Sequence, residues 1–268
     1  MSAGAGSLRD WNPEQYLKFD RERNRAVCDL ARRAREHLPG RPRIMDLGSG
    51  PGNSTAILAE IFPGSDLTGL DASPTMLAAA RAAHPELRFE AGDIRAWAEG
   101  TGADDELVFA NSVLHWLPQP ETLLPRLLGR VAPGGVFAFQ VPANWEAPVY
   151  QLPRELAAAP RWREFFHARP VSDWQTHELS YFYDLLAPHA AAFELWETVY
   201  VYAWPGPETI VAWYEGSGLR PYLAALPDEA ARQEFRAAYL EGLRHAHPPQ
   251  PDGKILFPFR RRFVMARR

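Results

Sequence analysis

Three glycines at alternate positions, Gly48, Gly50 and Gly52, stand between an apolar segment, 43–47, and a segment with helical spacing, 53–62. Glycine has no Cβ, so the backbone can turn tightly there and come close to a ligand. The start of the following helix adds free N–H groups that can donate hydrogen bonds. A dinucleotide fingerprint would read G-x-G-x-x-G and a P-loop would end in Lys-Ser/Thr, and this turn has neither pattern. We therefore expect a ligand of another kind at the turn.

Two aspartates follow the next expected strands. Asp71 ends the segment 67–70, about twenty residues beyond the glycines, where a carboxylate can accept hydrogen bonds from both hydroxyls of a ribose. Asp93 ends the segment 87–91, and with Ile94 it forms a pair suited to bind an adenine amino group and to cover the ring. The three strand ends together predict a pocket for adenosine.

Alternating strands and helices are needed to bring these residues to one edge of a sheet. Seven segments have the apolar or alternating character of strands: 43–47, 67–70, 87–91, 107–110, 136–141 (after a turn at 133–135), 193–204 and 261–266. Helical spacing is found at 13–37, 53–62, 74–84, 181–188 and, with breaks at 216–218 and Pro227, at 207–247. This alternation predicts an α/β fold with a mostly parallel, Rossmann-like sheet of seven strands, covered on both faces.

One domain with insertions is the expected organisation of residues 1–268. The expected parts are an N-terminal helix or lid at 1–40, a cofactor-binding core at 41–141, helical cap insertions at 142–180 and 205–250, and the final helix and strands of the core at 181–204 and 255–268. The stretch after Pro142 is rich in Trp, Pro and Arg and shows no clean strand, which favours its place in the cap.

The composition favours a small-molecule enzyme of the cytoplasm. The 29 Lys and Arg nearly balance the 33 Asp and Glu, without a basic stripe, so we expect no nucleic-acid partner. Cys28 is the only cysteine, which excludes an intramolecular disulfide framework. Neither an export signal nor a run of ~18 apolar residues is seen, so we expect no membrane association. The oligomeric state is left open.

The order of these motifs resembles the class I S-adenosylmethionine methyltransferases over about residues 44–141. Asp46 to Gly52, Asp71 and Asp93 match the first three motifs of that family. The resemblance implies S-adenosylmethionine as cofactor, with the glycine turn near its methionine part. The cofactor-binding residues that it implies are Tyr16, Arg25, Asp46, Gly48, Ser49, Gly50, Asn53, Asp71, Ala72, Ser73, Met76, Asp93, Ile94, Asn111 and Ser112.

A narrower resemblance, to the trans-aconitate methyltransferases, runs nearly from end to end. Short blocks carry it: Asp10-Trp11-Asn12-Pro13, Glu22-Arg23-Asn24-Arg25, Gly50-Pro51-Gly52-Asn53-Ser54-Thr55, Phe109-Ala110-Asn111, Trp116-Leu117-Pro118, Gln140-Val141-Pro142, Asn144-Trp145, Gly218-Leu219-Arg220-Pro221 and Arg261-Arg262-Phe263. Ser49 stands where cysteine is common in that family, and His115 where many members carry glutamine. The second departure affects the expected shape of the acceptor.

This resemblance implies methyl transfer to a carboxylate oxygen of a small tricarboxylic acid. A carboxylate with a pKa near 4 is already ionised at neutral pH, so we expect no catalytic acid or base. Fixed arginines suit such a polyanion because their forks match carboxylates at two points. Arg220 and Arg261 are the expected clamps; strand alternation in the run 260–262 allows only some of its arginines to point inward.

Aromatic and polar side chains complete the expected acceptor site. They are Trp116, His115, Asn144, Trp145, Trp213 and Tyr214. Arg21 and Arg25 lie one helical turn apart, and two interpretations of them stay open. They could belong to a lid whose arginine meets the methionine carboxylate of the cofactor, or to an ordinary helix face in contact with solvent. No metal is expected, since His245 and His247 have no obvious third ligand. Two other functions stay open: methylation of a phenol or amine, and a cofactor-binding module without turnover.

Overall fold

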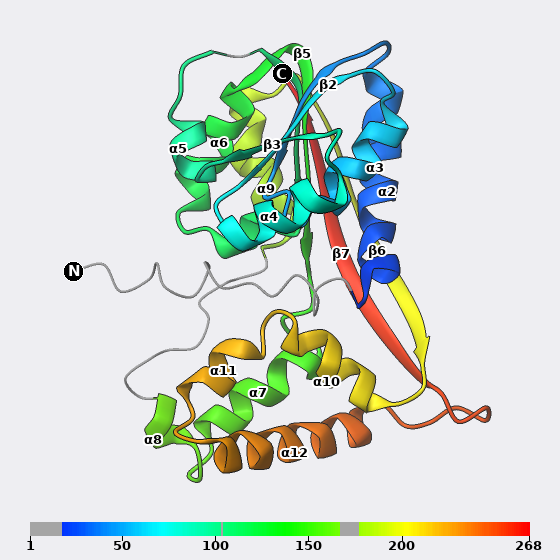
Figure 1. The fold of residues 1–268 in the computed structure, drawn as a ribbon, viewed down its shortest axis with the longest axis vertical. Helices are drawn as coiled ribbons and strands as arrows, with labels where there is room; N and C mark the ends of the chain where they lie inside the picture. Colours follow the sequence, from blue (N-terminus) through cyan, green and yellow to red (C-terminus); the bar gives the residue numbers. More distant parts are fainter. Residues whose placement is uncertain (1–17, 103, 167–176) are drawn as a thin grey trace.

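The computed structural model describes residues 18–102, 104–166 and 177–268, and one seven-stranded sheet organises them (Figure 1). The strands are β1 Arg43–Leu47, β2 Asp66–Asp71, β3 Arg88–Ala91, β4 Asp105–Asn111, β5 Val131–Pro142, β6 Ala192–Trp204 and β7 Ile255–Arg267. Their order across the sheet is β3-β2-β1-β4-β5-β7-β6. Strands β1 to β5 are parallel, and β7 runs antiparallel to β5 and β6. The predicted mostly parallel seven-stranded sheet is confirmed.

Helices cover both faces of the sheet, as its apolar central strands require. One core cluster joins α2 (Asp20–His37) and α3 (Asn53–Ile61) to the sheet, and a second joins α5 (Ile94–Ala98), α6 (Pro120–Gly129) and α9 (Leu179–Leu186). Helix α4 (Pro74–Ala83) packs on Phe89 near the β3 edge. Short 3₁₀ turns, η1 (Leu114–Trp116) and η2 (Ala187–His189), follow β4 and α9. Parallel strand ends therefore open at one edge, next to β1 and β4, where the chain reverses its direction across the sheet.

Five further helices form a separate layer that we call the helical lobe. They are α7 Pro148–Ala158, α8 Arg163–Phe166, α10 Pro207–Glu215, α11 Arg220–Ala225 and α12 Glu229–Ala246. Figure 1 shows β6 and β7 reaching from the sheet to this lobe, and the two strands stay paired from Ala192↔Arg267 to Trp204↔Ile255. Aromatic side chains such as Tyr150, Tyr214 and Tyr239 belong to the same core cluster as α2, so lobe and sheet share a core.

Several element boundaries differ from those expected. Helix α2 begins at Asp20, and residues 13–17 of the expected first helix lie outside the described residues. The turn expected at 133–135 is wrong, because β5 continues through it with Gly134 at φ +81°. Strand β7 begins at Ile255 rather than at 261, since its first half pairs with β6. Across the described ranges, no helix is both long and apolar enough to cross a bilayer.

Candidate active site

The glycine turn after β1 lies against the end of β2. Gly48, Gly50 and Gly52 have φ values of +70°, +56° and +94°, which side chains with a Cβ rarely adopt. A Cβ on Gly48 would also lie 2.5 Å from Val113 Cγ2. The Gly48 N–H donates to the Leu70 carbonyl over 2.7 Å, which joins the turn to β2. Gly48 is therefore needed for close packing against Val113, whereas the space beside Gly50 is open, with no atom of the described residues, its chain neighbours aside, within 4 Å of a Cβ built there. The close approach of a ligand to this turn, which we call the cradle, stays a prediction.

Asp71 closes this cradle from the end of β2. Its Oδ2 accepts a hydrogen bond from the Gly50 N–H and its Oδ1 one from the Ser73 N–H, both over 2.8 Å. Burial raises the pKa of Asp71, and these N–H donors act against that rise. A carboxylate has about four acceptor positions, so lone pairs are left for a ligand. Asp71 both fixes the glycine turn and offers an acceptor beside it.

Asp46 is fully buried beneath the turn. Its Oδ2 accepts hydrogen bonds from Ser54 Oγ and Thr55 Oγ1, each over 2.7 Å, which join β1 to the start of α3. Its Oδ1 is buried and has no hydrogen-bond partner among the described residues. Burial is the main cause that raises the pKa of Asp46 to about 6. Asp46 Oδ1 could therefore accept a hydrogen bond from a positively charged group of a ligand.

Five more of the residues expected around the cofactor lie near the first two strand ends. Ser73 caps α4 by accepting from the Met76 N–H, and both side chains are buried, whereas Ala72 is exposed. Ser49 is buried in the turn, and Asn53 donates a hydrogen bond to Asp20 at the start of α2. Tyr16 lies outside the described residues.

The third strand end differs from the expected adenine site. Asp93 caps α5 by accepting from the Arg95 N–H, and its Oδ2 lies 2.6 Å from the Arg95 guanidinium. The hydrogen bond from Arg95 is the main cause that lowers the pKa of Asp93. Ile94 is buried in the core cluster with α6, and its expected place over a ligand ring stays a prediction. An adenine at this edge would have to compete with Arg95 for Asp93.

A pocket that is partly open to solvent lies where the ends of β4 and β5 face the helical lobe. Its described lining residues are Arg23, Asn111, Ser112, His115, Trp116, Pro142, Tyr150, Trp213, Tyr214, Ser217, Gly218, Phe259 and Arg261. The lining includes two guanidinium groups and, among the described residues, no carboxylate. Aromatic rings form much of the rest. This composition suits an anionic ligand.

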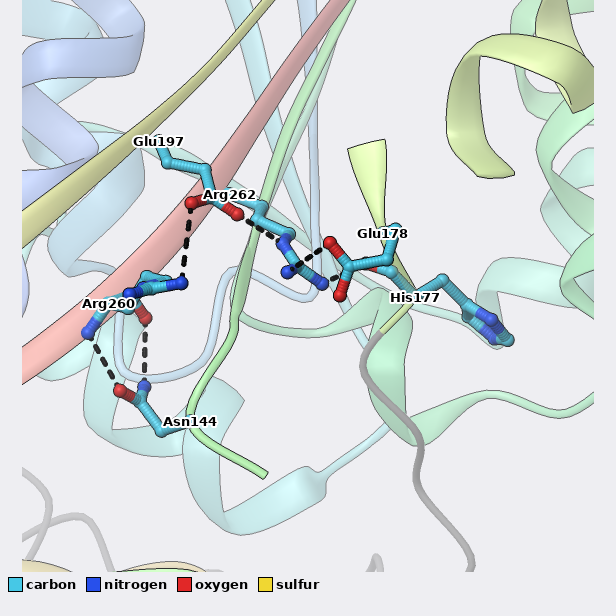
Figure 2. Close-up of polar contacts among 6 residues, drawn as sticks. All are labelled: Asn144, His177, Glu178, Glu197, Arg260 and Arg262. Atoms are coloured by element: carbon cyan, nitrogen blue, oxygen red, sulfur yellow. Dashed lines mark hydrogen bonds and ion pairs between the residues drawn. The ribbon is translucent and has the colours of Figure 1, made fainter. Parts of the chain in front are cut away.

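Strand alternation decides which arginine of the run 260–262 enters the pocket. Figure 2 shows Arg260 and Arg262 turned toward Glu197, and Arg262 also lies 2.6 Å from Glu178. Arg261 points to the opposite face, is only 5% exposed and donates to Ser112 Oγ over 2.6 Å. The acids therefore neutralise its two neighbours, and Arg261 provides positive charge to the pocket, as expected.

His115 and Trp116 also line the pocket, as their place after β4 predicts. Their rings lie 4.9 Å apart. Burial, and then the charge of Arg261, lowers the pKa of His115 to about 3. At neutral pH His115 is therefore an uncharged hydrogen-bonding group and adds no positive charge to the site.

Three residues expected at the acceptor lie elsewhere. Arg220 begins α11 and is not among the pocket-lining residues. Trp145 packs under the Arg154 guanidinium, 3.7 Å from it, outside the pocket lining. Asn144 uses its amide on the backbone of Arg260: Oδ1 accepts from N–H over 2.7 Å and Nδ2 donates to the carbonyl over 2.8 Å (Figure 2). Asn144 therefore holds β7 next to Arg261 instead of facing a ligand.

Six of the described pocket residues were not among the expected site residues: Arg23, Pro142, Tyr150, Ser217, Gly218 and Phe259. Arg23 lines the pocket, whereas the expected Arg25 is exposed over the rings of Tyr200 and Tyr202. Residues two apart on a helix lie on nearly opposite sides, so Arg23 faces this pocket and Arg25 does not. The expected contact of Arg25 with the cofactor stays a prediction. Tyr150 enters from α7, and nothing local in the sequence marks it.

Replacing Asn144 by alanine should lower the free energy of unfolding by about 1.5 kcal/mol, because two backbone groups of Arg260 lose their partners. Urea unfolding of the two proteins measures the difference. Gln233→Ala, at an exposed position of α12, is the control. Unchanged stability together with a large loss of acceptor affinity would instead place Asn144 in the pocket wall.

Comparison with protein families finds a methyltransferase domain over residues 45–137. The trans-aconitate 2-methyltransferase of Azoarcus sp. (strain BH72) is 44% identical over 256 residues, which are 96% of this chain and 98% of that protein. The enzyme of the same name from Paracidovorax citrulli (strain AAC00-1) is 41% identical over 261 residues, 97% of this chain and 99% of the relative.

Solved structures show the same fold at low sequence identity. The YcgJ protein from Bacillus subtilis has a TM-score of 0.59 and 14% identity, with 91% of this chain and 98% of that chain covered. Phosphoethanolamine N-methyltransferase 2 of Haemonchus contortus, solved with phosphomonomethylethanolamine and S-adenosylhomocysteine, has a TM-score of 0.54 and 15% identity, with 90% and 52% covered. At these identities the likeness concerns the fold alone.

Proposed function

This chain belongs to the family of trans-aconitate 2-methyltransferases, and we propose that it transfers the methyl group of S-adenosylmethionine to a carboxylate oxygen of trans-aconitate, giving the monomethyl ester. One observation carries the choice of acceptor: Arg23 and Arg261 line the pocket, and none of its described lining residues is acidic. An amine acceptor would find positive charge there without a counterion. A carboxylate acceptor finds donors that match it.

The residues around the glycine turn fit the cofactor. The cradle at Gly48 and Gly50 would hold the methionine part, and the remaining lone pairs of Asp71 would accept from the ribose. The buried Oδ1 of Asp46 offers an acceptor to a positively charged group of the ligand. When bound, S-adenosylmethionine supplies an electrophilic methyl group on a sulfonium. Asp93 belongs to the proposed site only if Arg95 gives way.

The chain's own part in the reaction is to bind, orient and exclude water. Arg261 orients the acceptor, and Trp116, Trp213 and Tyr214 shield the ionised oxygen from the water that would solvate it. No residue takes up a proton, because the nucleophile is already ionised at neutral pH. We further propose that a small polycarboxylate is the substrate, that the protein binds no nucleic acid, and that it acts in the cytoplasm.

The pH profile should follow from the lack of a base. We expect kcat with trans-aconitate to stay within about twofold from pH 6.5 to 9, since acceptor carboxylates with pKa values near 4 and a His115 with a pKa of about 3 keep their states there. Initial rates at saturating substrates measure this. A kcat that rises tenfold for each pH unit would point to an acceptor that must first lose a proton, such as a phenol.

The proposal is tested by incubating the purified protein with methyl-labelled S-adenosylmethionine and, separately, trans-aconitate, a phenol and a primary amine. Label should enter a product only with trans-aconitate, and mild alkali should release it as methanol, because esters hydrolyse and N-methyl groups do not. Base-stable label with the amine or the phenol would overturn the choice of acceptor. Cofactor binding without any product would indicate a module without turnover.

A further inference from the structure

Gln140 is a polar side chain with no exposed surface near the C-terminal end of β5. Its Nε2 donates to Asn111 Oδ1 over 2.8 Å and also to Ser112 Oγ. Its Oε1 accepts from Arg261 Nη1 over 3.4 Å. The one amide therefore links three side chains that line the pocket.

Arginine fixes the direction of every hydrogen bond in this group. A guanidinium only donates, so the oxygen of Gln140 must face Arg261 and its nitrogen must face the other two side chains. Asn111 must then accept with its oxygen, which turns its Nδ2 away from Gln140. Ser112 Oγ receives hydrogen bonds from both Gln140 and Arg261, which occupies its two lone pairs.

The groups left over at the pocket are donors. Ser112 keeps only its O–H proton to offer, and no described residue accepts it. Asn111 keeps its Nδ2, which donates to no described residue. With Arg261 beside them, Ser112 and Asn111 form a wall of the pocket whose unused hydrogens are N–H and O–H donors. Such a wall suits a ligand group that only accepts, which is a carboxylate.

Ser112 is held in an unusual backbone conformation at this wall. Its φ of +53° is uncommon for a residue with a Cβ and costs about 1–3 kcal/mol. Its N–H donates to the Gln140 carbonyl over 3.0 Å, so the same residue fixes both its backbone and its hydroxyl. Positions with such strain are concentrated at ligand sites.

We propose that Ser112 Oγ–H and Asn111 Nδ2–H donate hydrogen bonds to a carboxylate of the acceptor, and that Gln140 is the positioning residue that keeps both of them donors. This rests on the proposed function and assigns the two side chains to the acceptor instead of the cofactor. The methionine carboxylate of the cofactor has the same chemistry, so the two affinities must be measured separately. The assignment to the acceptor follows from the hydrogen bond between Ser112 and Arg261.

Gln140→Glu tests the direction of the network, because it exchanges one nitrogen for one oxygen. A glutamate only accepts, so Ser112 and Asn111 must turn their donors toward it, and its charge pairs with Arg261. We expect the KM for trans-aconitate and the dissociation constant of citrate to rise about twentyfold, with kcat and the dissociation constant of S-adenosylmethionine within about threefold. Gln233→Glu makes the same change at an exposed position of α12 and should leave all four values unchanged.

Ser112→Gly removes the hydroxyl without adding backbone strain, so it distinguishes a loss of acceptor binding from a loss of stability. Glycine adopts φ +53° without strain, so the melting temperature should not fall, while the KM for trans-aconitate should rise about tenfold. An unchanged KM in both variants, or a loss of cofactor affinity larger than the loss of acceptor affinity, would overturn the proposal. Wild-type protein that binds citrate but forms no ester would refute only the proposed function. Wild-type protein that binds neither trans-aconitate nor citrate would also refute the proposed hydrogen bonds from Ser112 and Asn111 to a carboxylate.

Discussion

Replacing Arg261 by methionine is expected to raise the KM for trans-aconitate by about 150-fold. Arg261 is 5% exposed, so the carboxylate that it meets gains a charge-assisted hydrogen bond away from bulk water, and its loss costs roughly 3 kcal/mol. Methionine keeps most of the side-chain volume beside Phe259, which limits the effect on folding. Initial rates against trans-aconitate, and calorimetric titration with S-adenosylmethionine, give the two affinities.

Three other arginine variants show what the Arg261 result means. Arg261→Lys keeps the charge but loses the fork, so its KM should lie between those of the wild type and the methionine variant. Arg220→Ala should raise the KM less than tenfold, because Arg220 does not line the pocket. Arg244→Ala, on the exposed side of α12, is the neutral control. An equal loss of cofactor and acceptor affinity in Arg261→Met would indicate damage to the fold instead of a lost clamp.

Replacing Asp46 by asparagine is expected to stabilise the protein without ligand and to weaken cofactor binding. The folded state raises the pKa of Asp46 from 3.8 to about 6, so ionising this buried carboxyl at neutral pH costs up to roughly 3 kcal/mol. Asparagine has no such cost, and its oxygen can still accept from Ser54 and Thr55. The positively charged part of the cofactor would lose its acceptor, so its dissociation constant should rise.

The sign of the pH dependence provides the check. The contribution of Asp46 to stability is full below its unfolded pKa of 3.8 and is lost as pH rises through about 6. The excess stability of Asp46→Asn should therefore be largest at pH 7.5, shrink as pH falls through 6 and vanish below 3.8. Denaturant unfolding at a series of pH values, without cofactor, measures it. A variant less stable than the wild type at pH 7.5 would show that the fold needs the charge.

The sheet and the cofactor edge could be predicted because local sequence determines both. Short apolar runs that end in Gly48 or Asp71 determine where the strands stop, and parallel connections bring those ends together. The broken helices after Pro207 could also be predicted, since Gly216-Ser217-Gly218 and Pro227 interrupt helical spacing at the points where α10, α11 and α12 are separated. In each case the signal lies within a few residues of the feature.

Side-chain roles were less predictable because distant contacts decide them. Asn144 stands in a polar motif, yet its amide is used on a strand 116 residues away. Asp93 stands at the expected strand end, yet Arg95, two residues on, occupies its carboxylate. Arg23 and Arg25 lie on different faces of α2. The Arg23 guanidinium lies over the ring of Trp213 in the lobe and that of Arg25 over the ring of Tyr200 on β6, and these rings are distant in sequence.

The glycine cradle and much of the pocket come from separate stretches of the chain. The cradle and its aspartates belong to residues 46–71, whereas Tyr150, Trp213 and Arg261 come from the lobe and the β6–β7 ribbon. A chimaera that exchanges residues 142–261 with those of a relative would replace eight of the thirteen described pocket-lining residues, including Arg261, and leave the hydrogen bonds of the cradle intact. Acceptor preference can therefore diverge, or be redesigned, while the methyl-donor half stays the same.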